Sequence, residues 1–359
     1  MAGTPPTDVP VHPVYAEALE RQLETMRFMR QRRPFDYVAK HIAREYGLPF
    51  TKPGAGEELD DIVADALERA APHFWTRHMG DLLGQTADTL PTGPTDDGRP
   101  GWVLKATDLA VPAGYLWFQD PLEITAGLND VADTERLTAL LWTPVARRPT
   151  IGGANFNRDP RGDAGYMVVP FTMFEGRDNG ALINVRHGTP RTPLHWRIGE
   201  SVGQFEQDLA QMYQDATYRS SVRLIAGMPA SFHAQQMVRF GRLFATAVAL
   251  MNQTLLVESA PYRGDRASRR RAQALAGRPI LPDEALVRTV MLRRREYVNK
   301  PSGDHDPVDW QYRWTVRPHW RNQWYPSENR HKPVLIGSYV KGPPDKPLKV
   351  STPLFVVSR

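Results

Sequence analysis

The sequence contains no cysteine, and this absence removes several classes of chemistry at once. Disulfide bonds, thiolate metal ligands and a cysteine nucleophile are all excluded. Long apolar runs are missing too: the best candidate, residues 243–256, contains four polar residues, whereas a membrane-spanning helix needs about 18 or more apolar residues in succession. Residues 1–13 have neither a basic start nor an apolar stretch and do not resemble a signal peptide. We therefore expect a cytoplasmic protein without a membrane partner.

Motifs for nucleotide binding, acyl transfer and zinc binding are also absent. The sequence has no G-x-x-x-x-G-K-[ST], no G-x-G-x-x-G after a predicted strand and no G-x-S-x-G. His73 and His78, like His187 and His195, lack the spacing of an H-E-x-x-H site. The sequence therefore predicts no cofactor and no metal site, and it identifies no catalytic residue.

Two pairs of acids leave one enzymatic alternative open. Asp120 and Glu123 follow the strand-like run 114–118, and Glu175 and Asp178 follow the run 166–174. If the two pairs converge, they can hold Mg²⁺ for phosphoryl chemistry, as in a metal-dependent nuclease. Solvated acids in loops explain the same residues without any site, and no lysine stands at a recognisable spacing.

Proline is abundant, and its distribution suggests how the chain is divided. The 32 prolines among 359 residues are close to twice the usual share of about 5%, which indicates many turns and short elements. We expect a flexible lead over 1–13, a helical N-terminal unit over 14–90, a linker over 91–101, a central α+β core over 102–300 and a β-rich C-terminal unit over 301–359.

The periodicity of apolar residues predicts an α+β fold. The central core is expected to hold a mixed or antiparallel sheet and one long core helix, with Ser231 as a plausible N-cap. The expected helices are 14–33, 34–46, 57–71, 202–213 and 231–257. The expected strands are 102–104, 114–118, 138–142, 166–174, 182–185, 286–292, 310–316, 334–340 and 354–357.

The most distinctive segment is the basic, aromatic stretch 310–349. It contains four of the nine tryptophans within 15 residues, and eight Lys/Arg against two acids. Its balance of +6 exceeds the +5 of the whole chain. Cations interleaved with flat rings are what a surface needs to hold a polyanion with exposed bases. Alternation around the turn-rich residues 326–329 predicts a hairpin that pairs about 312–324 with about 332–340.

Two interpretations of these rings remain open. Trp310, Tyr312, Trp314 and Val316 alternate with polar residues, which is typical of a strand with one face packed on a core. In that case Gln311, Arg313, Thr315 and Arg317 are the solvated face. The alternative is that the rings stack bases while the arginines contact phosphates. Residues 319–325 do not alternate cleanly, and the pattern there favours neither interpretation.

Arginines also cluster at 263–278 and at 293–295, which raises the possibility that the basic clusters form one patch. Each run is equally compatible with an ordinary solvated surface. The candidate residues for binding nucleic acid or another partner are Arg313, Arg317, His319, Trp320, Arg321, Trp324, Lys341, Arg270 and Arg294.

The pattern Arg313-Trp314-x-Val316-Arg317-x-His319-Trp320-Arg321-x-Gln323, followed by Val340-Lys341-Gly342-Pro343, resembles a group of proteins from phages, plasmids and actinobacterial genomes. That group is similar to an anti-CRISPR family directed at the type V-A effector, which is reported to lower production of the effector. The resemblance covers about 310–345. It implies a regulator acting on RNA or a translating complex, with Arg317, His319, Trp320, Arg321 and Lys341 as its functional residues.

The sequence thus favours a non-enzymatic regulator of mobile-element origin that binds RNA or a ribonucleoprotein. One alternative is the metal-dependent nuclease described above. The other is a protein-binding module, because Trp and Arg dominate interaction hot spots.

Overall fold

The computed structural model describes residues 9–46, 54–93, 101–124, 134–145, 164–175, 188–214, 230–253, 257–292, 311–316, 319–326, 330–336 and 339–348. The chain divides into two compact units, Met1–Leu292 and Arg293–Arg359. The first unit combines helices with a mixed sheet of eight strands, and the protein is of the α+β class, as the sequence predicts.

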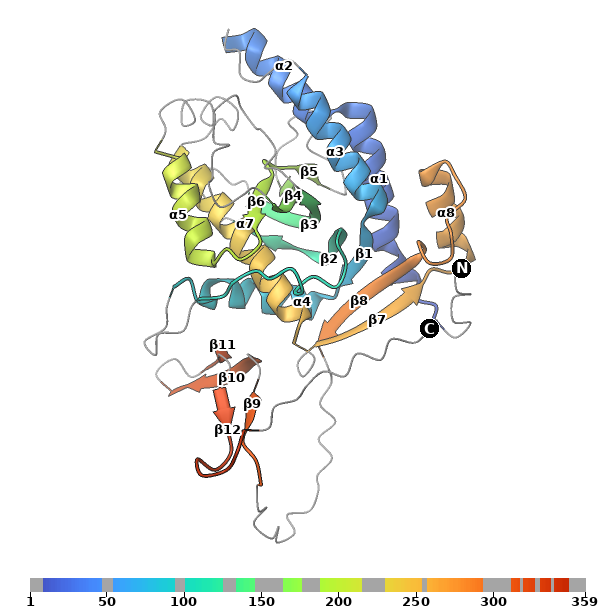
Figure 1. Cartoon of the computed structure of the whole chain (residues 1–359). Helices are drawn as coiled ribbons and strands as arrows, with labels where there is room; N and C mark the ends of the chain where they lie inside the picture. The colour runs from blue at the N-terminus through green and yellow to red at the C-terminus, as the bar shows by residue number, and fades with distance from the viewer. Residues whose placement is uncertain are drawn as a thin grey trace. The chain divides into compact units, whose positions relative to one another are not determined.

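The sheet of the first unit has the strand order β5-β4-β3-β2-β1-β8-β7, and β6 pairs with the same edge of β4 as β5 (Figure 1). The central strand β1 is parallel to both of its neighbours, whereas the remaining pairs are antiparallel. The strands are β1 (Ala71–Trp75), β2 (Gly114–Glu123), β3 (Thr134–Val145), β4 (Gly165–Glu175), β5 (Thr189–Pro190), β6 (Leu194–Arg197), β7 (Val257–Arg263) and β8 (Leu286–Leu292).

Helices cover both faces of this sheet. They are α1 (Pro13–Arg32), α2 (Pro34–Tyr46), α3 (Ala55–Arg69), α4 (Arg77–Thr86), the 3₁₀ turn η1 (Ala87–Thr89), α5 (Val202–Met212), α7 (Ala230–Met251) and α8 (Arg266–Ala276). Leu23 of α1 and Leu67 of α3 belong to one apolar core with Tyr115, Leu141 and Phe171 of the sheet. The N-terminal helices therefore share their core with the strands.

Aromatic rings fill the core on the α5 and α7 side. Trp196 of β6 stacks on Phe205 of α5 with ring centroids 4.3 Å apart, and Phe244 of α7 lies 6.1 Å from the same indole. Trp142 of β3 pairs with Gly114 of β2 and packs over it. A Cβ on residue 114 would come within 2.0 Å of the indole ring. Only glycine fits beneath this ring.

The strand β1 was not predicted from the sequence. Residues 14–90 were expected to form a helical unit, but Ala71–Trp75 forms the strand between β2 and β8. Four of its five residues are buried, and a parallel strand covered on both faces shows no alternation to reveal it. The expected strand 102–104 is also wrong, since it contains only a single bridge from Val103 to Ser201.

The long core helix is confirmed as α7, although its ends differ from the expected ones. It begins at Ala230, so Ser231 lies inside the helix and is not its N-cap. Val257 starts β7 and does not end the helix. The ends of the expected linker 91–101 lie together, because the amide of Trp102 donates to the carbonyl of Pro91 at 3.0 Å. The expected strands 182–185 and 354–357 lie outside the described residues.

The second unit contains two short antiparallel ladders. They are formed by β9 (Trp314–Val316) with β12 (Tyr339–Lys341), and by β10 (His319–Tyr325) with β11 (Arg330–Ile336). No helix in the described part of the chain is long and apolar enough to cross a membrane.

Candidate nucleic-acid interface

The predicted C-terminal hairpin is confirmed. In the β10–β11 ladder the last pair is Tyr325 with Arg330, so residues 326–329 form the connection. The turn-rich residues 326–329, between two segments with a strand-like pattern, were sufficient to locate this turn.

The second ladder continues the first in the same register. His319 pairs with Ile336. Val316, three residues before His319, pairs with Tyr339, three residues after Ile336. The two ladders follow one register, and between them they carry most of the predicted binding residues. Arg321 lies opposite Val334, and Trp314 lies opposite Lys341.

The Lys-Gly-Pro turn of the motif closes the open end of the hairpin. The amide of Arg313 donates to the carbonyl of Pro347 at 2.8 Å, and its Nε donates to the carbonyl of Lys346 at 2.8 Å. Gly342 has a φ of 118°, and a Cβ there would lie 2.9 Å from Cα of Arg313. Arg313 thus holds the turn in place, and Gly342 adopts a conformation that other residues rarely reach.

Several rings and cations of this hairpin are exposed. Tyr312 is 54% exposed, Trp324 42% and Tyr339 37%. Arg321 and Lys341 are also exposed, whereas Trp314 and Val316 are partly buried. The interpretation that the alternating rings form a core face is therefore wrong for Tyr312 and holds only in part for Trp314.

Two of the remaining residues named above are placed by their backbone alone, and three lie outside the residues that the structure describes. His319 and Trp320 belong to β10 by their backbone. Trp310, Arg317 and Arg294 lie outside the described residues.

Arg270 lies in the first unit, on α8. Asp265 caps this helix by accepting a hydrogen bond from the amide of Ser268 at 2.7 Å. Ser268 and Ala272 are the buried residues of the helix, whereas Arg266, Arg269 and Arg270 are exposed.

Other arginines of this basic segment are engaged in ion pairs. Both Nε and Nη2 of Arg271 lie 2.9 Å from the carboxylate of Glu20 on α1. Arg278 donates from Nη1 to Glu284 at 2.9 Å, and its Nε lies 3.8 Å from Glu68 on α3.

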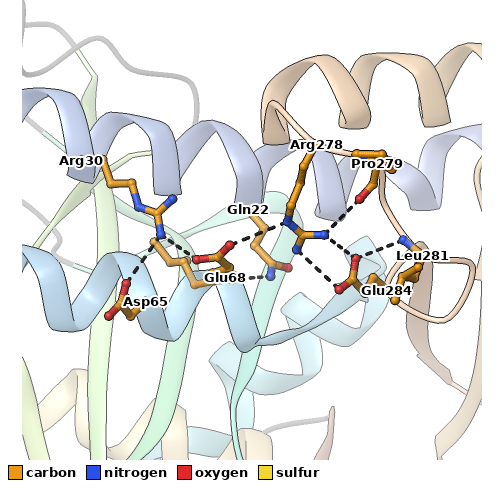
Figure 2. Close-up of polar contacts among 9 residues, drawn as sticks. Gln22, Arg30, Asp65, Glu68, Arg278, Pro279, Leu281 and Glu284 are labelled. Carbon is orange, nitrogen blue, oxygen red and sulfur yellow. Dashed lines mark hydrogen bonds and ion pairs between the residues drawn. The ribbon is translucent and has the colours of Figure 1, made fainter.

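Figure 2 shows how this pairing extends to α1. Glu68 accepts from Arg30 at 2.6 Å, and Arg30 also lies 3.5 Å from Asp65. Arg278 in turn contacts the carbonyl of Pro279 at 3.1 Å. These cations connect α1, α3 and the loop after α8, so Arg278 is neutralised within the fold. The expectation that the basic clusters share one face involves both units and stays a prediction.

The acid pairs expected for a nuclease have other partners or lie apart. Asp120 is within β2 and forms an ion pair with Arg77, the first residue of α4, whose amide donates to the side chain of Gln119 at 3.1 Å. Both acceptors lie between Trp117 and Leu122, where the register of β2 and β3 shifts. An acid beside the N-terminus of a helix is favourable there.

Glu123 and Glu175 are in β2 and β4, with β3 between them. Two strand spacings account for roughly 9–10 Å between their backbones. They are separated further along the strands, because Glu123 pairs with Arg136 whereas Glu175 pairs with Thr134. Asp178 lies outside the described residues, and among the described ones no group of three His, Asp or Glu is arranged to hold a metal ion.

A buried polar cluster at one end of β3 and β4 was not predicted from the sequence. Glu135 is 1% exposed and accepts hydrogen bonds from Thr172 at 2.6 Å, Arg191 at 2.6 Å and Gln236 at 2.5 Å. These donors come from β4, from the segment after β5, and from α7. The oxygens of a buried carboxylate need hydrogen-bond donors. Because Gln236 of α7 supplies one of them, the cluster attaches α7 to the sheet.

His233 lies one turn before Gln236 on α7 and bonds through Nδ1 to the hydroxyl of Tyr213. Burial, helped by the nearby Arg191 guanidinium, lowers the pKa of His233 to about 4. The imidazole is therefore neutral near pH 7. The spacing of His233 and Gln236, three residues apart and so on one face of α7, was the available signal for this cluster.

No family model, no curated protein and no solved structure matches the chain. The fold defines an α+β protein with a separate cationic, aromatic hairpin unit. The relation to the mobile-element group that the hairpin motif implies stays a prediction.

Proposed function

We propose that the chain is a non-enzymatic regulator that binds RNA or a ribonucleoprotein through its C-terminal hairpin. The observation that supports this is the exposure of both rings and cations along one hairpin. Tyr312, Trp324 and Tyr339 supply flat surfaces, and Arg321 and Lys341 supply positive charge. Such surfaces bind the backbone by charge and the bases by stacking.

The β9–β12 ladder favours unpaired bases. Trp314 lies opposite Lys341, and Tyr339 is two residues before Lys341 on the same strand. Trp314 and Tyr339 are therefore diagonal neighbours on one face, about 7–8 Å apart. This is roughly twice the 3.4 Å step of a stacked strand. Bases seated on the two rings would be unstacked from each other, which a single strand permits and a duplex resists.

The regulatory role comes from the resemblance of the hairpin motif to mobile-element proteins. Applied to this chain, it implies a regulator that acts on RNA or on a translating complex. In that role binding alone is sufficient, since occupancy of an RNA blocks other factors from using it.

Binding of a single-stranded RNA oligonucleotide over a series of salt concentrations tests the proposal. For Arg321→Ala with Lys341→Ala we expect weaker binding and a salt slope smaller by about 0.7 for each lost phosphate contact. Lys105→Ala, which removes an exposed cation of the first unit, is the control and should bind like the parent. Unchanged affinity in the hairpin variant would contradict the proposal.

A protein partner is the second candidate, because exposed Trp324 and Tyr312 have the chemistry of interaction hot spots. An aromatic hot spot depends little on salt, whereas RNA binding weakens steeply. Recovery of the partner that co-purifies with the chain, with and without RNase, separates the two. The nuclease alternative has less support, since Asp120 is paired with Arg77; Mg²⁺-dependent RNA cleavage would establish it.

A further inference from the structure

We propose that the outward arginine face of α8, formed by Arg266, Arg269 and Arg270, is a second binding surface, one that holds the phosphate backbone of a double-stranded nucleic acid. This inference rests on the proposed function and extends it, because it assigns a different ligand chemistry to the first unit of the chain.

The three arginines share one side of the helix. At 3.6 residues per turn, Arg266, Arg269 and Arg270 fall within an arc of about 100°. Ser268 and Ala272 lie on the opposite side and are buried. The three guanidinium groups are therefore held on the solvent side of one rigid element.

These arginines differ from their neighbours in how their charge is used. Arg271 is bound to Glu20, and Arg278 to Glu284. Within the residues that the structure describes, the side chains of Arg266, Arg269 and Arg270 contact no carboxylate. Three cations within five residues repel one another, so an external anion is the partner that relieves the repulsion.

The helix is a firm platform for such a contact. Besides the cap by Asp265 and the bidentate pair of Arg271, Arg27 of α1 donates to the carbonyl of Ala274 at 2.9 Å. Because α8 is fixed at several points, little ordering entropy is lost when a ligand binds.

The chemistry of the face selects a duplex backbone over unpaired bases. Helix α8 contains no aromatic residue, so it offers no ring on which a free base can stack. Guanidinium groups bind phosphate oxygens in bidentate fashion, and a duplex presents one negative charge per about 1.7 Å of its axis. Contacts to phosphate carry no sequence information, so this surface would be indifferent to sequence.

The test uses the full-length chain with Arg266→Gln, Arg269→Gln and Arg270→Gln combined. Its ligands are a blunt RNA duplex, a blunt DNA duplex and a single-stranded RNA oligonucleotide, each titrated over a salt series. We expect at least tenfold weaker binding of both duplexes at low salt. The salt slope should fall by about 0.9 for each lost phosphate contact. Binding of the single strand should change less than twofold.

A matched control removes the same charge elsewhere. Arg32→Gln, Arg69→Gln and Lys105→Gln are exposed positions of the first unit, and their combination should bind the duplexes like the parent. Because guanidinium groups stay charged, the effect should be constant from pH 6 to pH 9.

Three outcomes would overturn the inference. They are a parent chain that does not bind blunt duplexes, a control as defective as the α8 variant, and an equal loss of binding to anionic lipid vesicles, which would indicate a general anion surface. Failure of the proposed function would look different. In that case Arg321→Gln with Lys341→Gln would leave single-strand binding unchanged, whatever the α8 variant does.

Discussion

Gln236 of α7 donates a hydrogen bond from Nε2 to Oε2 of Glu135 on β3 at 2.5 Å, across 101 residues of sequence. Arg191 binds the other carboxylate oxygen of Glu135 at 2.5 Å. The main core helix and the sheet edge therefore meet at one buried acid, and the stability of the first unit depends on keeping that acid satisfied.

Arg191→Met should destabilise the protein by about 3 kcal/mol. The change leaves a buried carboxylate without its cation, which typically costs about 3–5 kcal/mol, and the lower end applies because the Arg191 side chain is 27% exposed. Urea unfolding measures the loss. Combination with Glu135→Gln should cost clearly less than the sum of the two single changes, because the residues interact directly. Strict additivity would contradict the pairing.

Two buried histidines should make the protein sensitive to acid. Burial lowers the pKa of both His73 and His233 to about 4, from a usual value near 6.5. Below pH 6.5 the unfolded chain takes up protons that the folded chain refuses, so the free energy of unfolding should fall as pH drops towards 4. At 1.36 kcal/mol per pKa unit, each histidine contributes up to about 3 kcal/mol.

Urea unfolding between pH 4.5 and pH 7.5 checks this dependence. His233→Gln should show a shallower dependence than the parent chain, because one of the two titrating groups is gone. Parallel profiles would show that His233 does not titrate as its burial implies.

Asp60 should act in the opposite direction. Its carboxylate accepts hydrogen bonds from the amides of Phe35 at 3.1 Å and Asp36 at 3.0 Å, yet burial raises its pKa from 3.8 to about 6. Between those values the unfolded chain releases a proton that the folded chain keeps. This group alone therefore lowers stability as pH rises from about 4 to about 6, by up to roughly 3 kcal/mol.

The Asp60→Asn variant isolates that contribution. It removes the titrating group, so its free energy of unfolding should rise more steeply between pH 4 and pH 6 than that of the parent. In the parent the two histidines outweigh the single acid, and the net change is still a gain of stability towards pH 6.5. A variant with the same slope as the parent would exclude Asp60 as the source.

Trp324→Ala should weaken binding of single-stranded RNA with little effect on folding. The side chain is 42% exposed, and loss of one base–ring stack costs about 1–3 kcal/mol of affinity. Trp314→Ala should lower both affinity and thermal stability, since that ring is partly buried. Thermal melts alongside RNA titrations check the pair, and full retention of affinity in both variants would exclude a stacking role for these rings.

Local patterns determined much of this protein. Alternation predicted the hairpin and its turn at 326–329, and helical spacing predicted α1, α5 and α7 closely enough to establish the α+β class. These features depend on neighbours two to four residues apart, where the side-chain period itself reports the backbone. The aromatic and cationic residues of the hairpin were predicted as candidates from their density in the sequence, which is also a local property.

Tertiary structure alone decided the partners of distant residues. Because β1 is buried on both faces, its residues show no alternation of apolar and polar side chains. Its place in the interior of the sheet followed only from its pairing with β2 and β8. Arg270 and Arg271 are adjacent in the sequence, but in the folded chain Arg271 forms an ion pair with Glu20, whereas Arg270 is exposed. Glu135 acquired its donors from three separate elements. Which charges are neutralised and which stay available to a ligand depends on contacts between segments far apart in the chain, and no local period records them.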